Sequence, residues 1–174
     1  MRVVGGELGG RRLATPTGAT TRPTTDKVRL AVFNSLRHLG VLDGAEVADL
    51  FAGSGALGIE ALSHGARRCT FVERDRDALT ALRENVELLG IADRARIVPG
   101  DVERSAVAYR SAEVVFADPP YGYARWPQLL SLVGPALVIA EAADPVEAPD
   151  GWNPVRAKRY GRTWVTFLAR SPAD

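Results

Sequence analysis

Short apolar runs and amphipathic stretches alternate through the middle of the chain. The apolar runs predict strands at residues 47–51, 69–73, 95–99, 113–117 and 136–141, and helical periodicity predicts helices at 56–64, 78–89 and 126–133, with a short helix before the fourth strand. The runs lack a polar residue at every second position, so we expect strands buried on both faces of a parallel sheet. This order of elements indicates an α/β protein with a doubly wound, Rossmann-like sheet.

The N-terminal stretch follows a different pattern. Residues 1–24 are rich in Gly, Pro and Thr around two short strand-like pieces, which predicts a small β-hairpin and an extended loop. Thr24 or Thr25 is suited to cap a helix that presents an apolar face and ends near Gly40. We expect residues 1–40 to form an arm attached to the rest of the protein.

The C-terminal stretch predicts an antiparallel hairpin. Residues 154–160 and 163–169 are strand-like, and the turn at Gly161 and Arg162 is too short for a parallel connection. Residues 41–174 are therefore expected to form one body, a doubly wound sheet that ends in this hairpin.

Composition excludes several classes of protein. A chain of 174 residues with one cysteine, Cys69, forms no internal disulfide, and two histidines, His38 and His64, assemble no zinc cluster. We expect Cys69 to be a core residue, both histidines to be exposed at helix ends, and no metal to be bound. No apolar run approaches the roughly 20 residues of a membrane span, and no signal peptide is recognisable, which favours a cytoplasmic protein.

The net charge of +1 hides an uneven distribution. Residues 1–37 hold 7 basic and 2 acidic side chains, residues 38–151 hold 10 and 18, and residues 152–174 hold 5 and 1. Because charges act within about 10 Å at ordinary salt, the two basic ends can attract an anion regardless of the sum. The candidates for phosphate contacts are Arg11, Arg12, Arg22, Lys27 and Arg29 near the N-terminus and Arg156, Lys158 and Arg159 near the C-terminus, although they could also be an ordinary solvated face.

A glycine-rich turn follows the first predicted strand. In the run from Asp49 to Gly58, Gly53 and Gly55 permit a tight turn and Gly58 permits close packing of helix on sheet. Glu73, twenty residues beyond Gly53, ends the second strand, where a carboxylate can accept hydrogen bonds from both ribose hydroxyls. Together the two features predict a nucleoside site, against the alternative of a purely structural turn.

Two cofactor classes fit a nucleoside site. A dinucleotide needs its pyrophosphate at the helix N-terminus and usually a second half-fold. S-adenosylmethionine carries an amine and a sulfonium, so the acid at the end of the first strand, Asp49, would be favourable to it; Asp49 could equally bind backbone amides of the glycine turn. S-adenosylmethionine is the cofactor we expect.

A second motif, Asp118-Pro119-Pro120-Tyr121, ends the fourth strand. Asp118, with a carbonyl of the two prolines, can accept both N–H bonds of an exocyclic purine amine and free the nitrogen lone pair for methylation. Tyr121 can stack on the base, and the prolines hold the acceptors in place. The alternative is an ordinary proline-rich turn, which the flanking Asp and Tyr disfavour.

These motifs resemble those of amino-directed class I methyltransferases, and nearly the whole chain resembles the RsmD family of bacterial 16S rRNA guanine-N2 methyltransferases. The further matches include Arg2 to Gly6, Gly10 to Leu13, Thr21 to Arg29, Phe33-Asn34 and Tyr160-Gly161. The resemblance implies that residues 22–25 lie over the pocket and that Asp101 and the Val102 amide bind adenine. The expected cofactor residues are thus Asp49, Phe51, Gly53, Ser54, Gly55, Glu73, Arg74, Asp101, Val102 and Thr24, and the expected catalytic residues are Asp118, Pro119, Pro120 and Tyr121.

Some positions depart from the family pattern, and other functions stay open. Gly9 stands where many members have Arg, and Leu30 where many have Glu. The expected partner is 16S rRNA, either alone or in the assembled small subunit, and the protein is expected to be a monomer. The alternatives are a DNA adenine-N6 methyltransferase, a non-catalytic rRNA-binding assembly factor and, third, a dehydrogenase; the position of Cys69 away from the fourth-strand turn argues against pyrimidine C5 methylation.

Overall fold

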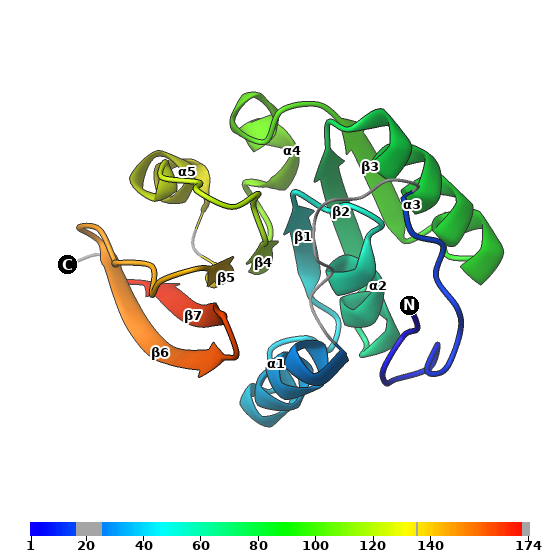
Figure 1. Cartoon of the computed structure of the whole chain (residues 1–174), viewed down its shortest axis with the longest axis horizontal. Coiled ribbons are helices and arrows are strands. Elements are labelled where there is room, and N and C mark those ends of the chain that lie inside the picture. Colours follow the sequence, from blue (N-terminus) through cyan, green and yellow to red (C-terminus); the bar gives the residue numbers. More distant parts are fainter. Residues whose placement is uncertain (17–25, 135, 172–174) are drawn as a thin grey trace.

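A computed structural model describes residues 1–16, 26–134 and 136–171 (Figure 1). Within these residues seven strands form one sheet in the order β3-β2-β1-β4-β5-β7-β6. The strands are β1 (Glu46–Leu50), β2 (Arg68–Glu73), β3 (Ala95–Pro99), β4 (Val114–Ala117), β5 (Leu137–Ala142), β6 (Trp152–Tyr160) and β7 (Thr163–Arg170). The first five run parallel, whereas β7 pairs antiparallel with both β5 and β6. The predicted α/β class, the doubly wound parallel sheet and the closing hairpin are confirmed.

Helices cover both faces of the sheet. They are α1 (Asp26–Leu39), α2 (Ala56–Ser63), α3 (Arg76–Leu89), a 3-10 turn η1 (Glu103–Ser105), α4 (Ala106–Tyr109) and α5 (Trp126–Leu132). The first three pack with one face of the strands in a hydrophobic cluster, and α4 and α5 pack with the other face in a second cluster (Figure 1). Burial of the sheet on both sides explains why the predicted strands were continuous apolar runs.

The two edge strands are less buried than the rest of the sheet, and β3 thereby departs from the expected burial on both faces. β3, at one edge of the sheet, is only partly buried, and β6, at the other edge, is exposed along its whole length except at its first residue, Trp152, and its partly buried last residue, Tyr160. An edge strand has one neighbour and less cover, so polar side chains are tolerated there.

The N-terminal residues form a short hairpin that is fastened to the body. Arg2 and Arg12 form an antiparallel bridge, and the buried Glu60 of α2 accepts hydrogen bonds from the amides of Val4 (2.9 Å) and Gly5 (2.8 Å). Burial raises the pKa of the Glu60 carboxyl. The buried apolar side chains of this segment and of α1 belong to the same hydrophobic cluster as the sheet. The predicted boundary at residue 40, between an N-terminal arm and the catalytic body, therefore stays a prediction. Thr24 and Thr25, the residues considered as helix caps, lie outside the described residues.

The single cysteine and the histidines can be located. Cys69 is fully buried in β2, as predicted, and burial raises the pKa of its thiol. His38 is exposed as expected, but the prediction for His64 is wrong: its side chain is 11% exposed and its ring stacks on Phe33 at 5.4 Å between ring centroids. Phe33 of α1 therefore covers one face of the imidazole. In the described part of the chain, no helix is long and apolar enough to cross a membrane.

Candidate active site

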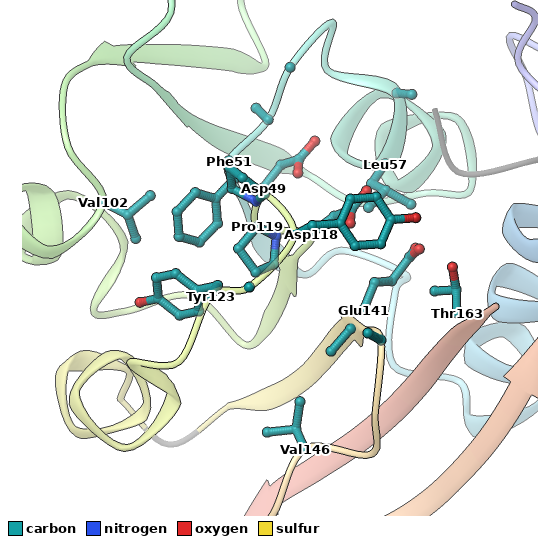
Figure 2. Close-up of a pocket in the computed structure, with 18 of the residues that line it drawn as sticks. Asp49, Phe51, Leu57, Val102, Asp118, Pro119, Tyr123, Glu141, Val146 and Thr163 are labelled. Atoms are coloured by element: carbon teal, nitrogen blue, oxygen red, sulfur yellow. The ribbon is translucent and has the colours of Figure 1, made fainter. Parts of the chain in front are cut away.

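A large open cleft of about 2400 Å³ lies at the carboxyl ends of the parallel strands. Its walls come from the loops after β1, β2, β3, β4 and β5, from the turn between β6 and β7, and from the start of α1. Figure 2 shows Phe51, Val102 and Tyr123 on one side of Asp118, and Glu141 and Thr163 on the other. Ligands of doubly wound sheets bind at this edge, so the cleft is the candidate active site.

The glycine turn has the backbone that its sequence predicts. Gly53 (φ 56°) and Gly55 (φ 83°) adopt left-handed conformations, and a side chain at Gly53 would meet no atom within 4 Å, which leaves open space for a ligand. A Cβ at Gly58 would overlap Phe71 and Cys69 of β2, so this glycine permits α2 to pack closely on the sheet. Phe51 is the non-glycine residue with positive φ (61°) among those described, and its ring faces the cleft (Figure 2).

Two carboxylates hold the glycine turn through its amides. Glu73 accepts from the amide of Gly53 (2.8 Å) through one oxygen, and from the amides of Arg74 (2.7 Å) and Asp75 (2.8 Å) through the other. Asp49 is buried and accepts from the amide of Gly58 (2.8 Å). Of the two roles considered for Asp49, binding to a backbone amide of the glycine motif is therefore confirmed.

The charges in this part of the cleft repel one another. Burial raises the pKa of Asp49 well above its ordinary value, the Gly58 amide opposes this, and the charges of Asp118 and Glu73 raise the pKa further. Three carboxylates this close to one another favour a cationic ligand and disfavour a phosphate.

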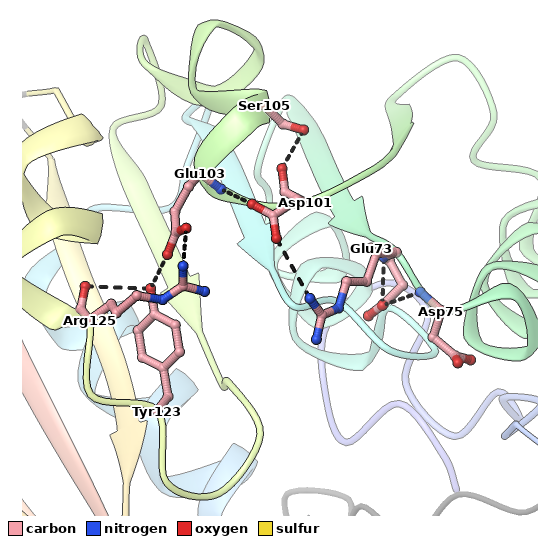
Figure 3. A network of polar contacts seen from close by, with 8 residues as sticks. Glu73, Asp75, Asp101, Glu103, Ser105, Tyr123 and Arg125 are labelled. Carbon is pink, nitrogen blue, oxygen red and sulfur yellow. Dashed lines mark hydrogen bonds and ion pairs between the residues drawn. The ribbon is translucent and has the colours of Figure 1, made fainter.

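The loop after β3 contributes the predicted adenine residues. Asp101 accepts a hydrogen bond from the Glu103 amide (3.1 Å), and its other oxygen lies 3.6 Å from Nη1 of Arg74 (Figure 3). Val102 is buried and borders the cleft, where Figure 2 shows it near Phe51. Ser54 lines the cleft too, and its carbonyl accepts from Asn85 (2.9 Å) of α3. The described cofactor candidates thus surround one compartment, except Gly55, which does not line the cleft and packs against Leu82 and Phe71. Thr24 lies outside the described residues.

The Asp-Pro-Pro-Tyr turn opens on the same cleft. Ala117 at the end of β4 pairs with Leu50 of β1 on one side and with Ala140 of β5 on the other, so Asp118 follows between Phe51 and Glu141. Adjacent strands are about 4.8 Å apart, which brings these three residues into one row across the sheet edge. Tyr121 is 71% exposed, so its ring is available for stacking. Pro119 and Pro120 also line the cleft.

Sequence reasoning missed Glu103, Tyr123, Arg125 and Glu141. Glu103 accepts a hydrogen bond from the Tyr123 hydroxyl (3.0 Å) and forms an ion pair with Arg125 (2.7 Å), as Figure 3 shows. Burial, and then the hydrogen bond and charge of Glu103, raise the pKa of Tyr123. Glu141 is 3% exposed at the end of β5. The one available signal was position, since each of these residues lies at or beyond the carboxyl end of a strand.

The basic residues near the N-terminus are not equivalent. Arg11 and Arg12 are exposed, although one guanidinium nitrogen of Arg11 donates to the Leu88 carbonyl (3.1 Å), and Lys27 is exposed at the cleft. The prediction that Arg29 contacts RNA is wrong. Its side chain is 0% exposed and donates to the Arg2 carbonyl (2.7 Å) and to Asp26 (2.6 Å). Arg22 lies outside the described residues.

Three basic residues of the C-terminal hairpin lie at the cleft. Lys158 and Arg159 of β6, with Arg162 in the turn, are exposed and line it. Arg156 is exposed and donates to the Ser35 hydroxyl of α1 (3.1 Å). Gly9 and Leu30, the two departures from the family pattern, are both exposed.

Comparisons with known proteins agree with this geometry. The sequence model of a family described as Conserved hypothetical protein 95 matches residues 1–169. The chain is 37% identical to "Putative rRNA methyltransferase YlbH" of Bacillus subtilis over 98% of this chain and 99% of that protein, and 42% identical to Ribosomal RNA small subunit methyltransferase D of Escherichia coli over 70% and 60%. A solved structure titled "Putative methyltransferase yhhF from Escherichia coli" has 32% identity and a TM-score of 0.85, covering 99% of both chains. The chain therefore belongs to the Conserved hypothetical protein 95 family, the RsmD family of methyltransferases.

Proposed function

We propose that this methyltransferase transfers a methyl group from S-adenosylmethionine to the exocyclic N2 of a guanine in 16S rRNA. The observation that carries the proposal is the position of the Asp118–Tyr121 turn, which opens on the same cleft as the glycine turn and Glu73. A methyl donor in the glycine compartment and an amine at Asp118 would meet inside one cavity. The names of the relatives supply the rRNA substrate.

The glycine compartment suits S-adenosylmethionine better than a dinucleotide. The charges of Glu73 and Asp118 both act on Asp49, so a sulfonium and an amine would be favourable there and a pyrophosphate would be repelled. Glu73 lies at the end of β2, where its carboxylate can receive the ribose hydroxyls; its amide partners already fix its orientation. In this proposal Asp101 and the Val102 amide bind adenine, and Phe51 provides an apolar surface.

The chain's role in the reaction is to orient the amine. Asp118 and a carbonyl of Pro119 or Pro120 accept the two N–H bonds, which pulls the nitrogen towards tetrahedral geometry and directs its lone pair at the methyl carbon. When bound, S-adenosylmethionine supplies an electrophilic methyl whose bonding pair leaves with the sulfur. The nitrogen gains the methyl and then loses a proton to Asp118 or water, so no strong base is needed. Tyr121 stacks on a base splayed out of the RNA.

The rim of the cleft supports a polyanionic substrate. Lys27 and the β6–β7 residues Lys158, Arg159 and Arg162 lie around the opening and can contact phosphates beside the splayed base. Arg11 and Arg12, which do not line the cleft, are proposed as more distant contacts. Arg22 is also proposed as a phosphate contact. Because ribosomal RNA is made and assembled in the bacterial cytoplasm, we infer that the protein acts there. We also propose that it acts as a monomer.

Methyl transfer from labelled S-adenosylmethionine tests the proposal. The acceptors are a 16S rRNA transcript, small subunits reconstituted with unmodified rRNA, and unmethylated duplex DNA. We expect label in one or both RNA samples, recovered as N2-methylguanosine after digestion. Label in DNA as N6-methyladenine would instead show the alternative methylase, and no transfer to any acceptor, with no calorimetric binding of the cofactor, would support a non-catalytic RNA-binding protein.

A further inference from the structure

The loops after β3 and β4 meet above the sheet although their strands are far apart. The sheet order places β2 and β1 between β3 and β4. Three strand spacings correspond to about 14 Å. Yet Glu103, from the β3 loop, contacts Tyr123 and Arg125, from the β4 loop, so side chains connect the two loops (Figure 3). Glu103, Tyr123 and Arg125 all line the cleft.

Tyr123 is the central residue of the connection. Its hydroxyl donates to Glu103 (3.0 Å), while its ring packs edge-on against Phe51 and Trp126, each at 5.3 Å between centroids. The Arg125 side chain is 57% exposed, so its ion pair with Glu103 is screened by solvent and contributes little. The partly buried hydroxyl bond is the stronger tie, because its loss leaves a carboxylate oxygen without that donor away from bulk water.

The tie joins two loops with different proposed tasks. The β3 loop carries Asp101 and Val102, the proposed adenine contacts, and Asp101 itself accepts from the Glu103 amide. The β4 loop carries Asp118 and Tyr121, the proposed contacts of the target base. Glu103 thus lies within a few residues of the proposed adenine contacts, and Tyr123 lies within a few residues of the proposed base contacts. The hydrogen bond between them joins the two sites.

We propose that the Tyr123–Glu103 hydrogen bond couples cofactor binding to RNA binding. Occupation of the adenine site fixes the β3 loop, and the hydrogen bond then restricts the β4 loop. Binding of the RNA base therefore costs less conformational entropy in the β4 loop. Binding sites that share an ordering cost bind their ligands cooperatively. Tyr123 and Glu103 are positioning residues in this scheme, which rests on the proposed function.

Binding of RNA with and without the reaction product S-adenosylhomocysteine measures the coupling. The RNA is whichever of the naked transcript and the reconstituted subunit is methylated in the assay above. For the wild-type protein we expect saturating product to lower the RNA Kd about 5- to 20-fold. Tyr123→Phe keeps the ring and removes the hydroxyl, and we expect the ratio to fall below about twofold. Glu103→Gln, whose amide oxygen can still accept from Tyr123, should retain part of the coupling.

Tyr109→Phe is the matched control. The Tyr109 hydroxyl donates to the Val102 carbonyl (3.1 Å), so this variant also removes one tyrosine hydroxyl bond from the β3 loop but does not cut the connection to the β4 loop. Loss of coupling in Tyr123→Phe with retention in Tyr109→Phe supports the proposal, provided that both variants unfold at similar temperatures. Equal coupling in the wild type and Tyr123→Phe, or equal loss of coupling in the two variants, overturns the coupling proposal. The proposed methyltransferase function would be unaffected by that result. A wild-type protein that neither binds the product nor methylates rRNA overturns both proposals.

Discussion

The two halves of the cleft differ in how their residues are held. In the cofactor half, formed by the loops after β1, β2 and β3, the acidic side chains are fixed by main-chain amides: Glu73 by Gly53, Asp49 by Gly58. In the target half, formed by the β4 loop and the β6–β7 turn, Tyr121 is 71% exposed and the basic side chains of the rim are exposed as well. The cofactor half has its acidic groups in place before a ligand arrives, and the target half presents Tyr121 and its basic side chains to solvent.

The difference matches the kinds of ligand proposed for each half. A small cofactor makes few contacts, so the cost of ordering flexible side chains would take up much of its binding free energy. A pre-organised site avoids that cost. A large RNA makes many contacts and can compensate for ordering the exposed side chains. Variants on the two sides should therefore separate cofactor affinity from turnover and RNA affinity.

The largest expected effect is that of Asp118→Ala. Loss of the acceptor leaves the amine nitrogen conjugated with the base, so we expect turnover with rRNA to fall at least about 10²- to 10³-fold. S-adenosylhomocysteine carries no sulfonium charge for Asp118 to attract, so its affinity, measured by calorimetry, should stay nearly unchanged. A parallel loss of cofactor affinity would instead assign Asp118 to the cofactor half.

Glu73→Ala tests the cofactor half. Charge-assisted hydrogen bonds contribute about 1.5–3 kcal/mol, so loss of the ribose acceptor should weaken cofactor binding about 10- to 100-fold. Because Glu73 also holds the Gly53 amide, Glu73→Gln is the control: it keeps an acceptor for this amide and should unfold close to the wild-type temperature. RNA affinity without cofactor should not change in either variant; a large change would remove the separation between the halves.

Charge removal at the rim should have a smaller effect. We expect Lys158→Ala with Arg162→Ala to weaken RNA binding several-fold and to reduce the slope of log K against log salt by roughly 0.7–0.9 for each phosphate that is no longer neutralised. Arg11→Ala, outside the cleft lining, should change the slope less. Cofactor affinity is the internal control. A larger reduction with Arg11→Ala would place the main RNA contact on the N-terminal hairpin instead of the rim.

Features of the fold and the site that depend on residues close in sequence could be predicted, and those that depend on residues far apart in sequence could not. The strands, the helices and the glycine turn depend on local periodicity and on positive φ, which single residues such as Gly53 reveal. The burial of Arg29 could not be predicted, because it results from the packing of residues 1–2 against α1, and no local sequence pattern encodes this packing. The Tyr123–Glu103 contact was equally hidden, since it joins loops of strands separated by two others in the sheet. His64 was misjudged for the same reason, because Phe33 covers it from another helix.

The smallest expected effect concerns pH and Asp49 in the cofactor half. Burial, together with the charges of Asp118 and Glu73, raises the pKa of Asp49, so this carboxyl takes up a proton at a higher pH than an ordinary aspartate. Its ionised form attracts a cationic ligand, and cofactor affinity should therefore decline as pH falls through this raised pKa. Asp49→Asn should remove that part of the pH dependence, which calorimetry over a pH series can measure.

The same ionisation has the opposite effect on folding. An acid whose pKa is higher in the folded state stabilises the fold below its unfolded pKa, and this contribution is lost as pH rises through the folded value. Asp49→Asn, whose amide oxygen can still accept from Gly58, should therefore lose less stability between acidic and neutral pH than the wild type does. If cofactor affinity and unfolding temperature followed pH identically in both proteins, Asp49 would be a backbone support alone, and the cationic preference of the cofactor half would have to come from Glu73 and Asp118.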